Sequence, residues 1–530
     1  MLQLTPLSVV SFGLFLLYRF IYVPLFYDPL SRIPGPWSFA ISKWRLAYEE
    51  WKGTRTQTIH RLHARYGPAV RIGPAEVAFN SLAALRTIYG AGSGFERTSF
   101  YDMFDVYGKK NLFTFHSSKD HGDRKKLLAH AYSKSVIVKG SVARGIEEKV
   151  RQFIDLIQRD PVCASEIFTS LHYFALDTIS DFLYGDIGKT TCLLGCGEDR
   201  ALLDDIMNIE RRKLSWFAVH FPKFTGWLYS RTGALEMLLQ PFYPMRKPTT
   251  YTGIRKHGLR AWEAFSASSA QSKLDPAVRS TIIGKLWEHH ESHKNGGLSD
   301  LDTASECADH LLAGIDTTSD TLMFLIWALS RSENRIYQER LIQEVRGIPT
   351  AVLNVDGIPS VEPCGRLPYL DAVIKETLRL YAPLPSSEPR SFHAATTIDG
   401  YHIPKGTIVS MAPYSLHRNP LVFTDPLKFN PERWLAPASE TADMKKWWWA
   451  FSSGGRMCIG MHLALAEMTT LVSAIYRNYH TTINQRLKHT TPGITSRFEV
   501  FYDETLPVMR EHECRIGFHP RCMAPIPSKC

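Results

Sequence analysis

Residues 451–460, Phe-Ser-Ser-Gly-Gly-Arg-Met-Cys-Ile-Gly, carry the most decisive pattern in this chain, and we call them the cysteine loop. Cys458 lies between a glycine-rich turn and a stretch that has the pattern of a helix start, with an arginine two residues before it. A helix N-terminus and a nearby cation both favour charged sulfur, so the sequence predicts a thiolate at Cys458. Such a thiolate serves as a nucleophile, a redox thiol or a metal ligand, and a buried structural cysteine is the plainer alternative.

The spacing within the cysteine loop narrows this choice. Phe451, Gly454, Arg456, Cys458 and Gly460 fit the pattern Phe-x-x-Gly-x-Arg-x-Cys-x-Gly. The pattern resembles the haem-binding loop of the cytochrome P450 family, in which a cysteine thiolate is the axial ligand of haem iron. The resemblance implies a haem b cofactor with Cys458 as its metal ligand and Phe451 packed against the sulfur. It also implies a mainly α fold with small β-sheets (α+β) in a single large domain.

A second motif, Ala313-Gly-Ile-Asp-Thr-Thr318, lies in the middle of a predicted helix over 300–331. Gly314 and the hydroxyl residues are poor helix formers, so the helix can bulge or kink there. The plainer alternative is a solvent-facing Asp316 and a Thr317 hydroxyl bonded to the carbonyl one turn earlier. The motif is similar to the family's oxygen-activation motif. By that resemblance Gly314 widens a groove beside the cofactor, Thr317 hydrogen-bonds dioxygen and Asp316 supplies protons.

Two further motifs predict a charge cluster. Glu376-Thr-Leu-Arg379 puts an acid and a base on one helix face, a spacing that occurs on many exposed helices. Phe429-Asn-Pro-Glu-Arg-Trp434 follows further along the chain. The family joins an arginine of the second motif to the helical pair, so the resemblance implies a buried cluster of Glu376, Arg379 and Arg433. Two cations against one anion in a dry interior are costly, so we expect the cluster to lock the cysteine loop rather than to add stability.

The two haem propionates need cations. Arg456 of the cysteine loop is the first candidate, and Arg390, after a proline-rich turn, is the second. Where the family usually has Trp-x-x-x-Arg on a helix, this chain has His121 and Lys125, with Arg124 adjacent. Lysine cannot make the bidentate contact that arginine makes, so the choice between Arg124 and Lys125 stays open. A solvated basic helix face is the alternative interpretation of this segment.

The first residues predict a membrane anchor. From Leu2 to Tyr18 the chain is uncharged and mostly apolar, and an apolar stretch continues after Arg19 to Phe26. About 20 apolar residues cross a bilayer, so the helix either ends near Tyr18 or lets Arg19 reach the head groups. A secretory signal peptide is the alternative, although a basic n-region and a small-residue cleavage site are missing. Basic residues after the span favour a single-pass protein with its body on the cytosolic side, and the family resemblance implies the membrane of the endoplasmic reticulum.

Ile33-Pro-Gly-Pro36 follows the anchor as a stiff elbow, because proline fixes φ and removes a donor. An anchor followed by a proline hinge resembles the microsomal members of the family. We therefore expect a membrane anchor at 1–26, a proline-rich hinge at 27–40 and a haem-thiolate catalytic domain at 41–530. Hydrophobic periodicity predicts strands at 69–73, 76–80, near 396–411 and beyond 480, and helices at 118–134, 140–158, 164–184, 300–331, 332–346, 367–381 and 459–478.

Composition limits the classes of partner. The chain has 530 residues and a net charge of +10, without a linker, repeat or low-complexity tract. Its basic residues are spread out and no nucleic-acid motif accompanies them, so we expect no nucleic-acid partner and favour membrane lipid and an acidic protein. The nine cysteines form no disulfide framework, which suits a reducing compartment.

The sequence thus predicts a membrane-anchored haem-thiolate monooxygenase, similar to fungal members of its family, that serves secondary metabolism. With O2 it would hydroxylate, epoxidise or otherwise oxidise a lipophilic small molecule. The chain contains no flavin or nicotinamide fingerprint, so we expect a separate NADPH-dependent flavoprotein reductase whose acidic face meets the basic surface near the cysteine. Aromatic segments at 95–104 and 216–224 suit a lid over an apolar pocket, and equally core packing.

Two alternatives remain open. A haem-thiolate isomerase or dehydratase acts without external electrons, but such proteins tend to lose the acid and the alcohol of the oxygen motif, and Asp316 and Thr317 both stand here. A non-catalytic haem-binding protein is the other alternative, and the intact oxygen motif argues against it. Turnover without a reductant would favour the first, and ligand binding without dioxygen consumption would favour the second.

Overall fold

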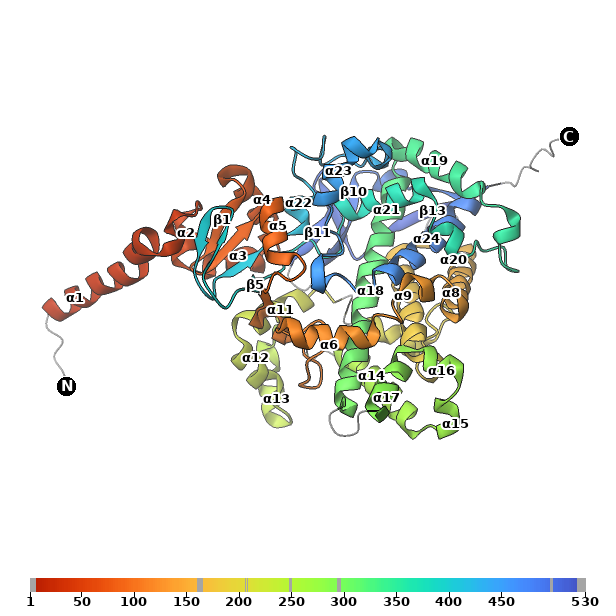
Figure 1. Ribbon diagram of the computed structural model, residues 1–530, viewed down its shortest axis with the longest axis horizontal. Coiled ribbons are helices and arrows are strands. Elements are labelled where there is room, and N and C mark those ends of the chain that lie inside the picture. Colours follow the sequence, from red (N-terminus) through yellow and green to blue (C-terminus); the bar gives the residue numbers. More distant parts are fainter. Residues whose placement is uncertain are drawn as a thin grey trace.

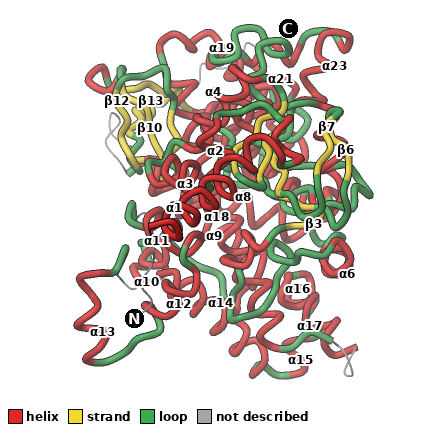
Figure 2. Tube along the Cα trace, turned by 90° about the vertical axis from the view of Figure 1, so that its left-hand side faces the viewer, coloured by secondary structure: helices red, strands yellow, loops and turns green. Residues whose placement is uncertain are grey.

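The computed structural model describes residues 6–159, 165–204, 206, 208–246, 250–292, 297–495 and 499–521. Helices form most of the body, and the strands are short. Figure 1 shows the long helix α18 (Asp300–Ser330) in the middle of the body, with the other helices around it. Figure 2 shows β10, β12 and β13 on one side and β6 and β7 on the other, with helices between. The predicted α+β class is confirmed.

The helices agree well with the periodic stretches of the sequence. The remaining α-helices of the described residues are α1 Pro6–Leu17, α2 Trp37–Ile41, α3 Trp44–Trp51, α4 Arg55–Tyr66, α5 Leu82–Tyr89, α6 Ser118–Leu128, α7 Lys134–Ile137, α8 Gly140–Gln158, α9 Ile167–Tyr184, α10 Gly197–Arg200, α11 Arg211–His220, α12 Pro222–Tyr229, α13 Ala234–Leu239, α14 Thr250–Ala267, α15 Ala270–Lys273, α16 Pro276–Ser280, α17 Ile282–Ser292, α19 Arg335–Arg346, α20 Val361–Cys364, α21 Pro368–Leu380, α22 Pro413–Leu416, α23 Ala438–Trp447 and α24 Met461–Asn478. The helix predicted at 118–134 is interrupted after Leu128.

The strands form small sheets that bring distant segments together. They are β1 Ala69–Gly73, β2 Glu76–Phe79, β3 Glu96–Arg97, β4 Ser165–Glu166, β5 Arg390–Ser391, β6 Thr396–Ile398, β7 Tyr401–Ile403, β8 Ile408–Ser410, β9 Tyr479–Ile483, β10 Thr490–Thr495, β11 Val500–Tyr502, β12 Val508–Glu511 and β13 Arg515–Pro520. The largest sheet has the order β1-β2-β8-β5-β3, and its antiparallel β3–β5 pair sets Arg97 opposite Arg390.

Helix α18 is continuous and capped at its start. Ser299 and Asp302 form a capping box, which satisfies backbone N–H groups that the first turn leaves without partners. Helix α9 makes the most extensive contact with α18. The two helices approach closely at Gly314, where a Cβ atom would lie 2.6 Å from Cγ1 of Ile179. Glycine is therefore required for packing at this position.

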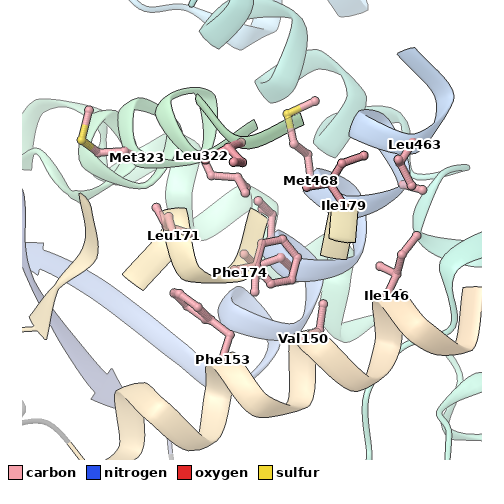
Figure 3. Packing of buried hydrophobic residues seen from close by; sticks show 14 of the residues in the cluster. Ile146, Val150, Phe153, Leu171, Phe174, Ile179, Leu322, Met323, Leu463 and Met468 are labelled. Atoms are coloured by element: carbon pink, nitrogen blue, oxygen red, sulfur yellow. The ribbon is translucent and has the colours of Figure 1, made fainter. Parts of the chain in front are cut away.

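The main core lies where α8, α9, α18 and α24 meet. Figure 3 shows apolar side chains from all four helices interlocking there. They include Ile146, Val150 and Phe153 of α8, Leu171, Phe174 and Ile179 of α9, Leu322 and Met323 of α18, and Leu463 and Met468 of α24. Close packing of this kind resists movement, so α18 and the start of α24 have fixed relative positions.

The N-terminal helix projects from the body (Figure 1). Helix α1 continues as the π-helical segment η1, Tyr18–Tyr27, which includes Arg19. By length and composition Val9–Tyr27 could cross a membrane, and a signal sequence passes the same test near an N-terminus. The predicted end near Tyr18 coincides with the change from α to π geometry, although the helical path goes on to Tyr27. The short η2 turn, Pro29–Arg32, and extended prolines then lead into α2.

Candidate active site

The cysteine loop is folded tightly against the segment after α5. The Cys458 backbone N–H donates to the Phe451 carbonyl at 2.9 Å, which closes the loop. Gly454 has a φ of +62°, and a Cβ there would lie 2.4 Å from the Tyr89 carbonyl oxygen. Only glycine adopts this conformation at so close an approach without strain. The glycine of the motif is thus explained by the geometry of the loop.

Cys458 faces a space inside the protein. Its side chain keeps solvent-accessible surface, yet burial is the largest influence on the thiol and raises its pKa above the usual 9.0. The backbone N–H groups of Gly460 and Met461 at the start of α24, together with Lys125, act in the opposite direction. Burial therefore opposes the predicted thiolate as long as no metal is coordinated to the sulfur. A coordinated metal would reverse the balance, since it deprotonates a thiol.

The neighbouring stretch of α18 borders a space as well. Ala313 is exposed although Leu311 and Ile315 on either side of it are buried. An alanine in the middle of a central helix can be exposed only if its neighbours leave room.

Four cations, Arg97, Lys125, Arg390 and Arg456, gather at the cysteine loop together with the imidazole of His121. Burial, and after it the charges of Arg97 and Arg390, lower the pKa of Arg456 to about 9. Burial and then the charge of Arg456 lower the pKa of His121 to about 3. Mutual repulsion of this kind indicates that the site is short of negative charge. A haem with two carboxylates is an anion that would relieve it.

Arg97 is the member of this group that the sequence did not mark. Its guanidinium donates to the backbone carbonyls of Leu112, at 3.3 Å, and Phe113. Its Nε is buried and has no hydrogen-bond partner among the described residues. A buried donor without a partner costs free energy, and an anion would satisfy it. No motif could have found Arg97, because its place beside Arg390 depends on strand pairing.

The predicted basic residues have distinct contacts. Lys125 Nζ donates to the carbonyls of Gly455, at 3.0 Å, and Met457, at 2.9 Å, so it braces the cysteine loop. Arg124 pairs instead with the fully buried Glu306 of α18. Arg124 is thus engaged with Glu306 and Lys125 with the cysteine loop, and which of the two contacts a propionate stays a prediction.

Arg456 and Arg390 tie the site to its surroundings. Arg456 donates to three successive carbonyls at the start of α6, those of residues 115–117, at 2.8–3.0 Å. Arg390 donates to the Tyr101 hydroxyl at 2.7 Å and to the Glu388 carboxylate at 3.0 Å. Glu388 also accepts from the Ser452 hydroxyl of the cysteine loop at 3.2 Å. Both arginines therefore have protein partners, and Glu388 is a contact that the sequence did not predict.

Glu376, Arg379 and Arg433 lie together in the interior. Two nitrogens of Arg379 donate to the Glu376 carboxylate, Nε at 2.8 Å and Nη2 at 2.9 Å, and Arg433 Nε donates to it at 3.1 Å. The Asn430 N–H and the Trp434 Nε1–H also donate to it, at 2.8 Å and 3.0 Å. Burial would raise the pKa of Glu376, but the two arginines hold it below its usual value.

His417 connects this cluster to the cysteine loop. Its Nδ1 lies 3.2 Å from the Arg379 carbonyl, and its Nε2 accepts from the Trp449 N–H at 2.8 Å. These roles require the neutral ring with the proton on Nδ1. Burial and the neighbouring arginines Arg379 and Arg418 lower the pKa of His417 to about 3, so the ring stays neutral. Two residues before Phe451, Trp449 thus fixes the start of the loop.

The oxygen motif combines features of both interpretations made from the sequence. The Thr317 hydroxyl donates to the Ala313 carbonyl at 2.8 Å, as in the plainer alternative. The plainer alternative expected Asp316 to face solvent. Instead its carboxylate pairs with the buried Arg211 of α11 at 3.3 Å. The expected bulge is not found, since α18 is continuously α-helical. Gly314 faces Ile179 of α9, where a side chain would not fit. Its role is therefore in helix packing, which differs from the predicted cofactor contact.

The two aromatic segments differ in their surroundings. Phe104 lines a small cavity beside α18, together with Val106, Ile254, Arg255, Ala308, Asp309 and Leu312. Trp216 packs instead against Trp51 of α3 and donates to the Ala47 carbonyl at 2.8 Å. A larger cavity of about 170 Å³ lies between α8, α9 and α16, and neither a cysteine nor a cation lines it. We regard that cavity as unrelated to the site at Cys458.

The residues fit a haem better than a bare metal ion. Among the described residues no group of three or more His, Cys, Asp or Glu side chains has the arrangement to hold a metal ion. Cys458 would therefore bind a metal only within a cofactor that brings its own ligands. Haem brings four ring nitrogens, and its carboxylates suit the four cations described above.

Comparison with known proteins agrees with this geometry. A family model described as cytochrome P450 matches residues 252–497. Cytochrome P450 monooxygenase stcB of Emericella nidulans is 31% identical over 461 residues, which cover 85% of this chain and 82% of that protein. Cytochrome P450 monooxygenase orf2 of Aspergillus niger is 30% identical, with 85% and 86% covered. Pisatin demethylase of Fusarium vanettenii is 28% identical, with 91% and 89% covered.

Proposed function

Because the chain belongs to the cytochrome P450 family and is a haem-thiolate monooxygenase, we propose that it oxidises a lipophilic small molecule of secondary metabolism at a membrane surface. It uses O2, electrons from a redox partner and a small-molecule substrate. The relatives reported above are named monooxygenases or a demethylase. Their names favour oxidation over the isomerase or dehydratase alternative. The observation that carries the proposal is the crowding of cations beside a cysteine that faces an internal space.

We assign the axial position on haem iron to Cys458, and the carboxylates to Arg97, Arg390 and Arg456 with help from His121. When bound, haem supplies the one-electron and oxygen chemistry that protein side chains lack. Phe451 lies beside Cys458 through the backbone bond that closes the loop, and it limits water at the sulfur. Lys125 holds the loop itself rather than the cofactor.

Asp316 and Thr317 are assigned the handling of protons and of dioxygen. The Thr317 hydroxyl donates a hydrogen bond to the Ala313 carbonyl one turn earlier, which leaves its oxygen lone pairs free to accept a hydrogen bond. The Asp316 carboxylate is oriented by its ion pair with Arg211, and we assign proton transfer to it. We propose that both side chains act in this way during turnover.

We propose an NADPH-dependent flavoprotein reductase as the electron donor. Exposed lysines on two elements near the cysteine loop, Lys119 and Lys126 of α6 and Lys445 and Lys446 of α23, support an acidic docking partner. Met457, next to Cys458 in sequence, is itself exposed and offers an apolar centre for such a contact. Raising the salt concentration should slow electron transfer, because charged contacts at a rim act mainly on the association rate.

We further propose that residues 1–26 anchor the protein in the endoplasmic reticulum membrane, that 27–40 form a hinge and that 41–530 form a catalytic domain on the cytosolic side. An apolar surface supports this. It combines Trp37, Trp44 and Trp51 after the anchor with Phe224, Trp227, Met237, Leu238 and Phe242 on or beside α12 and α13, all of them exposed. Trp44 stacks on Phe221 at 5.4 Å, so the two parts of this surface adjoin. Lipid would cover both parts and the anchor together.

The identity of the product and its dependence on NADPH test the proposal. The chain is expressed in a microsomal host with a reductase, polyketide, terpenoid and alkaloid precursors are supplied, and products are identified by mass spectrometry. An oxygenated product that depends on NADPH and is lost in Cys458→Ser supports the proposal. A product that forms equally well without NADPH would instead support the isomerase or dehydratase.

A further inference from the structure

A second buried carboxyl group lies one turn beyond Asp316 on α18. Asp320 is 6% exposed, and its Oδ1 has no hydrogen-bond partner among the described residues. The Oδ1 of Asp316 is likewise buried without a partner there, while its Oδ2 contacts Arg211. Residues four apart share one face of a helix, so both unpaired oxygens lie on the same side of α18.

Two titratable groups from other helices face this pair of carboxyl groups, Arg211 and His172. Arg211 Nη2, at the start of α11, lies 3.3 Å from Asp316 Oδ2. His172 Nε2, on α9, lies 3.9 Å from Asp320 Oδ1. The Nδ1 of His172 is 2.8 Å from the Phe168 carbonyl and must donate to it, so Nε2 carries a lone pair rather than a proton. Burial lowers the pKa of His172, so the ring brings no positive charge to Asp320.

Carboxylates on adjacent turns of one helix face do not both ionise readily, because each charge opposes the other. Arg211 contacts Asp316 directly, so a positive charge lies beside that carboxylate. Burial, and after it the charge of Asp316, raise the pKa of Asp320 well above its usual value. A protonated Asp320 fits this arrangement. After a small rotation its O–H group can donate to the unprotonated Nε2 of His172.

We propose that Asp316 and Asp320 form an acid pair that shares one proton, with Asp320 as a positioning residue that holds the proton and passes it to Asp316. In that transfer the O–H bond of Asp320 breaks, an O–H bond forms at Asp316 Oδ1, and the negative charge moves to Asp320. Solvent water supplies the next proton. The inference rests on the proposed role of Asp316 as the acid of the oxygen motif, and it adds a proton store behind that acid.

Infrared spectroscopy of the purified haem-containing protein tests the pair without a substrate. A protonated carboxyl group has its own C=O stretching band, which shifts in deuterium oxide. Subtracting the spectrum of Asp320→Asn from that of the wild type at pH 7 should leave one such band. In Asp316→Asn the band of Asp320 should titrate away at a pH lower by about one unit or more, a tenfold loss of proton affinity, because a like charge has been removed.

Glu467 of α24 provides the matched control. It is fully buried, and its pKa is raised to about 8 by burial, so it is a second protonated carboxyl group in the same core. Glu467→Gln should remove a band that Asp316→Asn leaves unchanged. A purely structural Asp320 would leave no band coupled to Asp316. The proposal is overturned if Asp320→Asn removes no band, or if the Asp320 band titrates alike with and without Asp316.

The outcome is separable from that of the proposed function. If the coupled band is present while Asp316→Asn keeps the wild-type product yield, the acid pair exists and the role assigned to Asp316 fails. If Asp316→Asn loses product formation and no coupled band is found, the role of Asp316 stands and the proton store at Asp320 is refuted.

Discussion

Replacing Glu376 by glutamine tests whether the buried charge cluster holds the cysteine loop. The carboxylate receives hydrogen bonds from two N–H groups of Arg379, one of Arg433, the Asn430 N–H and the Trp434 ring. Glutamine keeps the volume but offers one acceptor oxygen, and its NH2 group faces arginine donors. Two buried cations then lack a counter-charge. Breaking a buried ion pair by removing one partner costs about 3–5 kcal/mol.

The assay has two measurements, the free energy of unfolding in urea and the ratio of haem to protein after purification. We expect the unfolding free energy to fall by about 3–5 kcal/mol, a large part of the usual stability of a domain. We expect haem content to fall as well, because Arg379 holds His417, which in turn fixes Trp449 before the cysteine loop. The unfolding measurement reports the cluster, and the haem ratio reports its connection to the loop.

Glu432→Gln is the matched control, since it removes an acid from the same second motif. Its side chain is 38% exposed and pairs with Arg340 on the surface, and such pairs contribute about 0–1 kcal/mol. If Glu376→Gln matches Glu432→Gln in both unfolding energy and haem content, the reasoning about the cluster is wrong.

The same cluster predicts a dependence on pH. The arginines hold the pKa of Glu376 below its ordinary value of 4.5. A group whose folded-state pKa is depressed contributes stability above its unfolded-state pKa and loses it as the pH falls through the folded-state value. The wild type should therefore lose stability below about pH 4.5 more steeply than Glu376→Gln, which has no proton to bind there. Parallel urea titrations of the two proteins through this range measure the difference.

Three further predictions concern the cations, the oxygen motif and the membrane. Arg97→Leu should release haem to an acceptor protein about tenfold faster than wild type, because one charged hydrogen bond is lost. Arg335 is exposed, so Arg335→Leu should release haem at the wild-type rate. Equal rates in the two variants would exclude Arg97 as a carboxylate contact. Thr317→Ala should keep the haem spectrum while the share of NADPH used for product falls about tenfold and hydrogen peroxide rises, and an unchanged share would refute the assigned role. Deleting residues 1–26 should weaken binding of the protein to lipid vesicles only in part. Adding Leu238→Glu and Phe242→Glu to the deletion should abolish the remaining vesicle binding. Complete loss of vesicle binding on deletion alone would argue against the apolar surface.

Much of the site could be predicted because its parts are short motifs. The cysteine loop, the oxygen motif and the Glu376–Arg379 pair each occupy a few consecutive residues, and local geometry explains them. Gly454 is required by a positive φ and by the nearby Tyr89 carbonyl. The long helices follow from hydrophobic periodicity, and α18 and α21 lie within two residues of their predicted bounds.

The sequence by itself determined the kind of chemistry, the helical character of the body and the residues that most closely surround the sulfur. Only the tertiary structure decided which cations face the site, since Arg97 reaches Arg390 through strand pairing and Arg124 turns to Glu306 instead. It also decided the partner of Asp316, which is Arg211 of another helix. The physical reason is that periodicity and spacing describe one segment at a time. The charge state of a buried group depends on every segment packed around it, and those segments come from distant parts of the chain.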